Sequence, residues 1–306
     1  MTQTMTASDT PSEAVHSVGW IGAGKMGGPM ARNLLDSGTA VVVLEPDAAN
    51  RDRLTAAGAT TAESTTGFAD VGIVFSTLPN DAVLIDVVGT VNDNGLAAAL
   101  PRGAVVVEMS TVSPECSERV ATRLAEAGIR YVRAPLSGST DMAASAALTV
   151  LASGDRSGWE DALPCIRRLS ARQFFLGEGE EARYMKLVLN TLVGASSAVL
   201  SEALAVGASG GLSRADMMNV ICESAVASPL FKYKQQAVVN DDFAPAFSVS
   251  QMIKDFTLIS DAARHNGVPL LTTGLILELY RSAANAGMQD EDFFALVKWQ
   301  ENLSTR

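Results

Sequence analysis

Few side chains in this 306-residue chain could exchange a proton near neutral pH, and their scarcity narrows the possible chemistry. Of the two histidines, His16 lies in a polar N-terminal stretch and His265 lies in the helix-end context "RHNG". Both positions favour a surface side chain over a catalytic imidazole. The cysteines, at positions 116, 165 and 222, have neither the paired spacing of a zinc site nor the even number of a disulfide framework. We therefore expect chemistry without a metal, in a reducing cytoplasm.

Lysine is the remaining candidate, and Lys186 stands out among the six lysines. Asn190 follows it by four residues in a run with helical periodicity, so both side chains lie on one helix face. Burial beside a cofactor would lower the pKa of the lysine toward neutrality, where an amine can both donate and accept a proton. The alternative is a helical lysine whose stem is packed and whose ammonium reaches water. The pattern alone leaves both interpretations open.

A glycine-rich stretch, "SVGWIGAGKMGGPMARNLLDSG" at residues 17–38, has the spacing that binds the pyrophosphate of a dinucleotide. Gly22 permits a tight turn, Gly24 lets backbone N–H groups approach the phosphates, and Gly27 lets helix and strand pack closely. The N-terminus of the following helix adds partial positive charge. An ordinary glycine-rich turn is the alternative, but the strand pattern before the loop and the helical pattern after it favour dinucleotide binding.

The acidic residue Glu45 ends a second strand-like run, "AVVVLEP", near the offset at which a carboxylate accepts hydrogen bonds from the adenosine ribose. A carboxylate at this place repels a 2′-phosphate, so the sequence favours NAD over NADP. Arg51 or Arg53 could still reach a phosphate. A solvated charge at a strand end is the alternative interpretation of Glu45.

These residues need a scaffold, and the chain from Val18 to Gly177 alternates short β-branched runs with helical periodicity. The composition of buried strands is found in "AVVVLEP", "VGIVFSTLP", "GAVVVEMST", "RYVRAPLSG" and "LTVLASGD". Helical spacing is found in "AANRDRLTAAG" and "SERVATRLAEAG". The alternation predicts an α/β Rossmann-type domain with a doubly wound, mostly parallel sheet between two layers of helices.

Strand patterns stop near Gly177, and "EARYMKLVLNTLVGASSAVLSEALAVGASG" at 181–210 has the period of one long helix that Gly194 weakens only modestly. Later segments, such as "RADMMNVICESA", "SQMIKDFTLISDAARHNG" and "TTGLILELYRSAANAG", are also helical in spacing. We therefore expect a disordered tail at 1–17, a dinucleotide-binding domain at 18–178 and an all-helical domain at 179–306.

The composition limits the possible partners. The formal net charge of −11 at pH 7 repels phosphate backbones and anionic membrane surfaces, which argues against nucleic-acid and membrane binding. No uninterrupted apolar stretch reaches the roughly 18 residues of a membrane span. Small molecules are the expected partners.

Several motifs occur in order along the chain, beginning with "GAGKMGGPMARNLLDSG", which includes Met26, Ala31 and Asn33. The others are "TLPND" at 77–81, "EMSTVSP" at 108–114, "APLSGSTDMAASAALT" at 134–149, "GEGEEARYMKLVLN" at 177–190 and "KDF" at 254–256. From Val18 to about Asn302 the chain resembles the β-hydroxyacid dehydrogenases, the family that contains 3-hydroxyisobutyrate dehydrogenase. Such a series is far more specific than one glycine loop.

The resemblance implies roles for individual residues. Lys186 transfers the proton and Asn190 orients the substrate. Thr111, Ser137, Gly138 and Ser139 hold the substrate carboxylate. The cofactor contacts implied by the same motifs are Gly22, Ala23, Gly24, Lys25, Met26, Gly27, Glu45, Leu78, Pro79, Thr111 and Lys254.

Three residues depart from the pattern of the family. Ser139 replaces a glycine, which adds a hydroxyl and restricts the backbone where substrate should lie. Arg133 stands where the family often has aspartate, and Ala146 where it often has glycine. We expect these departures to alter the substrate rather than the chemistry, although drift at a tolerant position explains Ala146 equally well.

The resulting hypothesis is NAD-dependent oxidation of a small β-hydroxy acid, or the reverse reduction, in a cleft between the two domains. A homodimer or larger homo-oligomer through the C-terminal helices is also expected. Two alternatives stay open: a reductase of imines or uncharged carbonyls, although the lysine at 186 argues against imine reductases, and a dinucleotide sensor without turnover.

Overall fold

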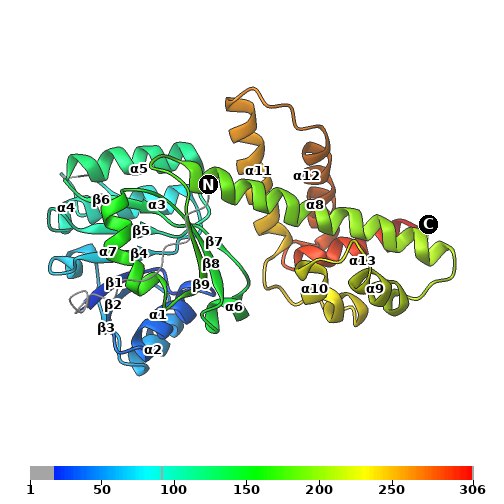
Figure 1. Ribbon diagram of the computed structural model, residues 1–306, viewed down its shortest axis with the longest axis horizontal. Coiled ribbons are helices and arrows are strands. Elements are labelled where there is room, and N and C mark those ends of the chain that lie inside the picture. Colours follow the sequence, from blue (N-terminus) through cyan, green and yellow to red (C-terminus); the bar gives the residue numbers. More distant parts are fainter. Residues whose placement is uncertain (1–16, 91, 305–306) are drawn as a thin grey trace.

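The computed structural model describes residues 17–90 and 92–304, in two domains that are joined by one long helix (Figure 1). Most of the tail expected at 1–17 lies outside the described residues. Ser17 is an exception and corrects that assignment, because it is the first residue of a strand and pairs with Ala40. The sheet therefore begins one residue earlier than the sequence suggests.

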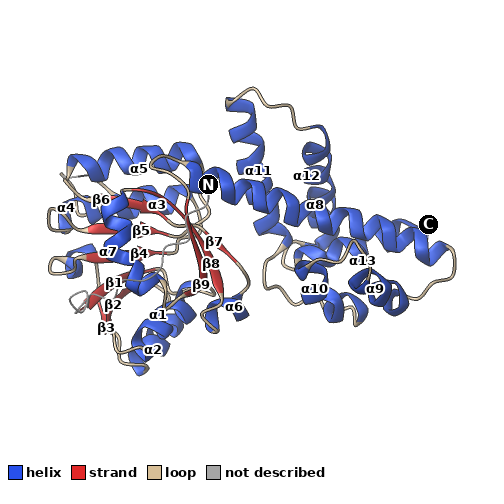
Figure 2. Ribbon diagram, viewed as in Figure 1, coloured by secondary structure: helices blue, strands red, loops and turns tan. Residues whose placement is uncertain are grey.

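The described residues of the N-terminal domain form a nine-stranded sheet (Figure 2). Its strands are β1 (Ser17–Ile21), β2 (Ala40–Leu44), β3 (Thr60–Thr61), β4 (Ile73–Ser76), β5 (Val105–Glu108), β6 (Arg130–Arg133), β7 (Leu136–Ser137), β8 (Leu148–Gly154) and β9 (Ser170–Phe175). The order β3-β2-β1-β4-β5-β6 is parallel throughout, whereas β8 is antiparallel to β6 and β7 and parallel to β9. From β1, the strand order runs in one direction through β2 and β3 and in the opposite direction from β4 through β5 and β6. A switch point of this kind, here between β1 and β4, forms a crevice in which ligands bind. The predicted Rossmann-type fold is confirmed.

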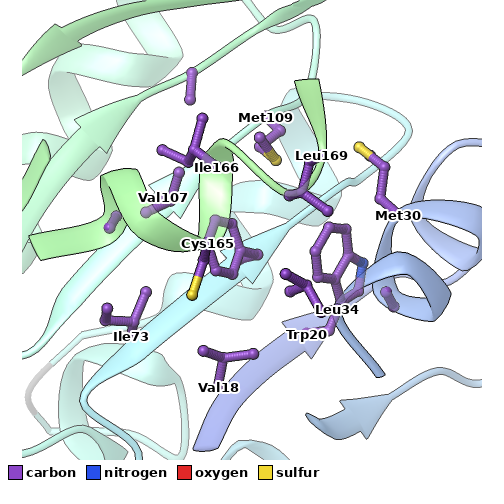
Figure 3. Close-up of a cluster of buried hydrophobic side chains, with 14 of the residues drawn as sticks. Val18, Trp20, Met30, Leu34, Ile73, Val107, Met109, Cys165, Ile166 and Leu169 are labelled. Atoms are coloured by element: carbon purple, nitrogen blue, oxygen red, sulfur yellow. The ribbon is translucent and has the colours of Figure 1, made fainter. Parts of the chain in front are cut away.

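Helices cover both faces of this sheet, which explains why the central strands are apolar on both sides. They are α1 (Gly27–Asp36), α2 (Ala48–Ala56), η1 (Thr65–Phe68), α3 (Asp81–Val88), α4 (Leu96–Ala99), α5 (Pro114–Glu126), α6 (Thr140–Ala144) and α7 (Arg156–Ile166). Phe75 of β4 packs in the cluster of α1 and α7, and its neighbour Val74 packs in the cluster of α3 and α5. Figure 3 shows the first cluster, with Trp20 of β1 beside Leu34 of α1.

Local signals explain several element ends. The hydroxyl of Ser113 accepts a hydrogen bond from the backbone of Cys116, and Pro114 occupies the first turn of α5. The segment "RYVRAPLSG", which we expected to form one strand, is divided into β6 and β7. Pro135 lies between them and has no N–H for the ladder.

The second half of the described chain is helical, as predicted. Its helices are α8 (Glu181–Ser209), α9 (Arg214–Glu223), α10 (Pro229–Val239), α11 (Val249–His265), α12 (Leu271–Ala283), η2 (Ala284–Met288), η3 (Phe293–Ala295) and α13 (Leu296–Ser304). The short helix α10 was not predicted. Ser228 caps its N-terminus and Pro229 begins it, so a local start signal was present in the sequence.

Helix α8 extends from the sheet domain through the helical domain (Figure 1). The helix has 29 residues, and its most apolar 18-residue segment has a mean hydropathy of 1.5. By length and composition alone, it could therefore span a membrane. The helix packs against α9, α11, α12 and α13. These contacts identify α8 as the core helix of the C-terminal domain.

The packing of α8 on α11 predicts an unusual response at Gly194. Helix propensity alone favours alanine over glycine by about 1 kcal/mol. A Cβ at Gly194, however, would lie 2.3 Å from Cε2 of Phe256 on α11. The backbone carbonyl of Gly194 also accepts a hydrogen bond from the Tyr280 hydroxyl at 3.0 Å, which holds the helix in place. Gly194→Ala should therefore lower the free energy of unfolding by about 1–3 kcal/mol through overpacking. Urea unfolding followed by circular dichroism measures this change.

A matched control is Gly274→Ala in α12, where an added Cβ has no atom within 4 Å. This variant should gain about 0.5–1 kcal/mol from helix propensity. A Gly194→Ala protein as stable as the parent would contradict the helix packing described above.

Candidate active site

A cleft of about 1490 Å³ lies between the two domains at the switch point of the sheet. Its walls come from the glycine loop, the ends of β2, β4 and β5, the segment 136–142, and faces of α8, α10 and α11. Of the site residues expected from the sequence, all but Ala23 line it: Gly22, Gly24, Lys25, Met26, Gly27, Glu45, Leu78, Pro79, Thr111, Ser137, Gly138, Ser139, Lys186, Asn190 and Lys254. The fold therefore brings together residues more than 200 positions apart.

The three glycines of the loop have different physical roles. Gly22 has φ +83°, and a Cβ there would lie 2.3 Å from the carbonyl oxygen of Thr77. A Cβ at Gly27 would lie 2.0 Å from the carbonyl oxygen of Gly22, so this glycine permits the close approach of α1 to the strand end. Gly24 has no atom within 4 Å of an added Cβ and opens onto the cleft.

The glycine loop fits the pyrophosphate of a dinucleotide. Among the described residues, the backbone N–H groups of Gly24, Lys25 and Met26 have no hydrogen-bond partner, and α1 begins at the next residue, Gly27. Free N–H groups at a helix N-terminus form an anion site. The N–H of Ala23 is already bonded to the carboxylate of Glu45, which explains why Ala23 does not line the cleft.

Glu45 is held at the end of β2 beside the glycine loop. Its side chain is buried, with one oxygen accepting from the Ala23 N–H and the other from the Asp47 N–H at 2.8 Å. Arg51 lines the same end of the cleft, but its guanidinium donates to the carbonyl of Glu45 at 3.0 Å. Arg53 does not line the cleft and instead bonds Asn50. The adenosine end therefore combines a fixed carboxylate with one nearby arginine.

The first turn of α8 is anchored in the sheet domain by Arg183, which the sequence analysis overlooked. This side chain is only 1% exposed and pairs with Glu108 at the end of β5. It also donates to the carbonyl of Ser110 at 2.7 Å and the hydroxyl of Tyr131 at 3.0 Å. Burial is the largest single influence and favours the neutral form, but Glu108, Tyr131 and Glu180 together outweigh it and raise the pKa of Arg183. The anchor fixes α8 one turn before Lys186.

Lys186 enters the cleft from α8, three residues after the anchor. Its side chain is partly buried, and among residues 17–90 and 92–304 its ammonium has no hydrogen-bond partner. Burial lowers the pKa of Lys186 below its ordinary value, the positive charge of Lys254 lowers it further, and the carboxylate of Asp255 opposes both. This is the environment that lets a lysine exchange protons near neutrality.

Asp255 is the second residue that the sequence analysis missed. It is fully buried on α11, and one carboxylate oxygen accepts from Nδ2 of Asn190 while the other lies 3.1 Å from Nζ of Lys254. The carboxylate therefore holds Asn190, one helical turn after Lys186, by its amide. The signal was present, because Asp255 is the middle residue of the "KDF" motif, whose lysine alone was considered.

Two lysines join the domains across the cleft. Nζ of Lys254 donates to the carbonyl of Thr111 at 2.8 Å, and Nζ of Lys25 donates to the carbonyl of Pro245 at 3.3 Å. Each bond links a residue of one domain to the backbone of the other. Together they bring the glycine loop and the segment after β5 against the helical domain.

The segment at 137–139 has a different geometry from the one expected. Gly138 has φ +144°, and a Cβ there would lie 2.7 Å from Cδ2 of Leu148, so glycine is required. Ser139 has φ −98° and is the N-cap of α6, where its hydroxyl accepts from the N–H of Met142 at 3.3 Å. The expected backbone restriction at Ser139 is therefore wrong, because its φ is open to any residue. The pattern of a serine before the polar pair Thr-Asp could have revealed the cap.

The other two departures lie outside the cleft, so our expectation that they alter the substrate is not supported. Arg133 pairs with Glu180, the residue before α8, and donates to the hydroxyl of Ser117 at 3.2 Å. It strengthens the attachment of the long helix. Ala146 has φ +54°, a left-handed conformation in which glycine is the less strained residue.

The cysteines are buried and free, and burial raises the pKa of the Cys116 thiol to about 12. A thiol with such a pKa is a poor nucleophile. Within the described part of the chain, no group of three or more His, Cys, Asp or Glu side chains could hold a metal ion.

Two family models match almost the whole of the described chain. The family model described as the NAD-binding domain of 6-phosphogluconate dehydrogenase matches residues 17–177. The model described as the NAD-binding of NADP-dependent 3-hydroxyisobutyrate dehydrogenase matches residues 180–300.

Individual relatives span almost the whole chain. The 2-(hydroxymethyl)glutarate dehydrogenase of Eubacterium barkeri is 32% identical over 94% of this chain and 95% of its own. The glyoxylate/succinic semialdehyde reductase 1 of Arabidopsis thaliana is 29% identical over 92% of this chain and 97% of its own. The crystal structure of 3-hydroxyisobutyrate dehydrogenase from Salmonella typhimurium has a TM-score of 0.83 at 28% identity, covering 92% of this chain and 99% of that chain.

The fold and these matches define an NAD-binding oxidoreductase with a separate helical domain. The chain belongs to the β-hydroxyacid dehydrogenase family, as its motifs suggested.

The electrostatics around Lys186 predict how its titration responds to Asp255. The carboxylate of Asp255 raises the pKa of Lys186, so Asp255→Asn should lower that pKa further. With Lys186 in the proton-transfer role that the family resemblance implies, the neutral amine would accept the proton in the oxidative direction, and the acid limb of the kcat/KM profile should move to lower pH. In the reductive direction, the alkaline limb should move the same way. Steady-state kinetics across pH measure both limbs.

Asp261→Asn is the matched control, because Asp261 lies on the same helix but forms an exposed ion pair with Arg264. It should leave the profile unchanged. A profile of Asp255→Asn that does not move, or that moves to higher pH, would refute the coupling between Asp255 and Lys186.

Proposed function

We propose that this protein oxidises a small β-hydroxy acid with NAD to the 3-oxo acid or semialdehyde, or catalyses the reverse reduction. The observation that carries the proposal is Lys186, an unbonded ammonium with a lowered pKa in the interdomain cleft. The names of the relatives, a hydroxy acid dehydrogenase and a semialdehyde reductase, support the same reaction in its two directions.

One set of cleft residues would bind the dinucleotide. The N–H groups of Gly24, Lys25 and Met26 would hold the pyrophosphate, Glu45 the adenosine ribose, and Leu78 and Pro79 the side of the dinucleotide. When bound, the nicotinamide ring exchanges a hydride with the substrate carbon.

The substrate end is formed by the remaining residues. Ser137, Ser139 and the backbone at Gly138 would bind the substrate carboxylate, with Thr111 beside them. Asn190 orients the hydroxyl, and Lys186 accepts its proton during oxidation and returns it during reduction. Lys254 would contact the nicotinamide side while it bonds Thr111.

The proposal predicts activity of the parent protein on 3-hydroxy acids and its loss in Lys186→Ala. General acid–base catalysis contributes about 10²–10⁴, so turnover should fall by about 100-fold or more. Binding of NADH, followed by its fluorescence, should persist because the glycine loop is unchanged. A panel of 3-hydroxy acids assayed with NAD and with NADP, and of aldehydes with NADH, provides the measurement.

Lys232→Ala is the control, since Lys232 is exposed on α10 away from the cleft wall. Near-normal turnover of Lys186→Ala would remove the lysine from the mechanism. A parent protein that binds NADH but oxidises no acid would identify a dinucleotide sensor, and faster turnover of imines or uncharged carbonyls would identify a reductase of that kind.

We further infer a soluble cytoplasmic protein that forms a homodimer through α8. The three free, buried cysteines suit a reducing compartment. Val188, Leu192, Val199 and Val206 are 51–72% exposed and lie on one face of α8, because their spacing of four, seven and seven residues follows the helical period. An apolar stripe of this length suits a second copy of the chain.

Light scattering tests the dimer. The parent protein should have twice the mass of the chain, and the double variant Leu192→Glu/Val199→Glu should be a monomer because it places charges on the stripe. Val226→Glu, an equally exposed valine outside α8, should remain dimeric. A parent protein that is a stable monomer at micromolar concentration would overturn this inference.

A further inference from the structure

The wall that the helical domain contributes to the cleft is basic in an acidic protein. Among the described residues, this wall carries Lys186, Lys234 and Lys254 and no carboxylate, although the chain has a formal net charge of −11. The two acidic residues that line the cleft, Glu45 and Glu63, belong to the sheet domain. The charge of this wall favours an anionic ligand.

Two of the three lysines already have functions. Lys186 is the proposed proton donor and acceptor, and Lys254 bonds the carbonyl of Thr111 and pairs with Asp255. Lys234 has no part in the proposed reaction. It is only 6% exposed, yet it lines the cleft.

Lys234 comes from one face of α10, where Pro229, Leu230 and Tyr233 also line the cleft. Helix α10 lies nearer the sheet domain than α9 does (Figure 1). Residues three and four positions apart on a helix share a side, as Leu230 does with Tyr233 and Lys234, so α10 presents an apolar surface with one lysine.

The ammonium of Lys234 is held rigidly. Its Nζ donates to Oδ2 of Asp292 at 2.7 Å and lies 5.1 Å from the ring centre of Tyr233, 5.3 Å from that of Phe293 and 5.6 Å from that of Phe294. An ammonium has three N–H donors, and the described residues satisfy one of them. A buried ion pair gives little net stability, so its presence at a cleft wall calls for another explanation.

Asp292 lies behind the ammonium rather than in the cleft. It is 2% exposed, does not line the cleft, and uses its second oxygen to accept from the N–H of Phe294 at 3.1 Å. Of this ion pair, the lysine therefore lines the cleft and the carboxylate does not.

We propose that Lys234 binds a second carboxylate of the substrate, so that the preferred substrate is a hydroxy dicarboxylic acid or its oxo counterpart. This inference rests on the proposed function, which places the first carboxylate at Ser137–Ser139 and the reacting hydroxyl at Lys186. Leu230, Phe247 and Phe293 line the same wall and suit the methylene carbons between the reacting carbon and the distal carboxylate. A single rigid ammonium without an arginine suits a carboxylate better than a phosphate dianion.

The test compares two acids that differ in one group. In 2-(hydroxymethyl)succinate the side chain ends in a carboxylate, and in 2-(hydroxymethyl)butanoate it ends in a methyl group. The variant Lys234→Met/Asp292→Asn removes both charges and keeps the side-chain volume, so no buried carboxylate is left unpaired. Lys232→Met is the control, because it removes one positive charge from the same helix outside the cleft.

The parent protein and Lys232→Met should prefer the diacid in kcat/KM. The double variant should lose about 10- to 100-fold with the diacid and little with the monoacid, since one charged hydrogen bond is lost. Equal kcat/KM for the two acids in the parent, or an equal loss for both in the double variant, would overturn the role of Lys234.

Calorimetric binding of the same two acids to the NADH-bound protein separates the two proposals. Tighter binding of the diacid that depends on Lys234, without turnover of either acid, would support the carboxylate site and refute the proposed reaction. Turnover with equal binding of the two acids would support the reaction and refute the site.

Discussion

The buried pair between Arg183 and Glu108 determines where Lys186 lies in the cleft. Helix α8 is roughly 43 Å long at 1.5 Å per residue, and most of it belongs to the helical domain. Its orientation in the cleft would be poorly fixed without a contact to the sheet domain near its first turn. Arg183 supplies that contact through four residues of the sheet domain, and Arg133 adds a second ion pair at Glu180. Because both anchors precede Lys186 by one to two turns, the lysine inherits a fixed position.

The pKa of Lys186 depends on the balance between its burial and the charges of the neighbouring side chains. Burial and the ammonium of Lys254 favour the neutral amine, whereas the carboxylate of Asp255 favours the charged one. The same carboxylate binds Asn190, so one buried acid acts on both polar residues of the α8 stripe. Asp255 lies on α11 and does not line the cleft. Its negative charge therefore acts on Lys186, but its carboxylate does not contact a ligand in the cleft.

The sequence was sufficient for features that short segments encode. The glycine loop, the alternation of strands and helices, and the bounds of α8 follow from local spacing and the 3.6-residue period. The sequence did not reveal the roles of Arg183, Asp255 and Lys234, because each of these residues bonds to a partner 58 to 75 positions away along the chain. Ser139 was misread for a different reason: we considered the glycine it replaces rather than the helix it caps.

The departure at Arg133 illustrates the same limit. In the sequence it stands where the family often has aspartate, and from that departure we expected an effect on the substrate. In the fold, β6 ends there and the side chain turns away from the cleft toward the start of α8. Proximity along the chain does not imply proximity to the site, because Pro135 separates β6 from β7, and Arg133 and Ser137 belong to different strands.

The bonds from Lys25 and Lys254 across the cleft end on main-chain carbonyls. Carbonyl acceptors carry no net charge, and water can replace each of them at a cost of a few kcal/mol at most. Separating the two domains to open the cleft would break both bonds. The first turn of α8 stays attached to the sheet domain through Arg183. Once the bonds from Lys25 and Lys254 break, rotation of the helical domain about this turn opens the cleft and gives the bound cofactor a route of release.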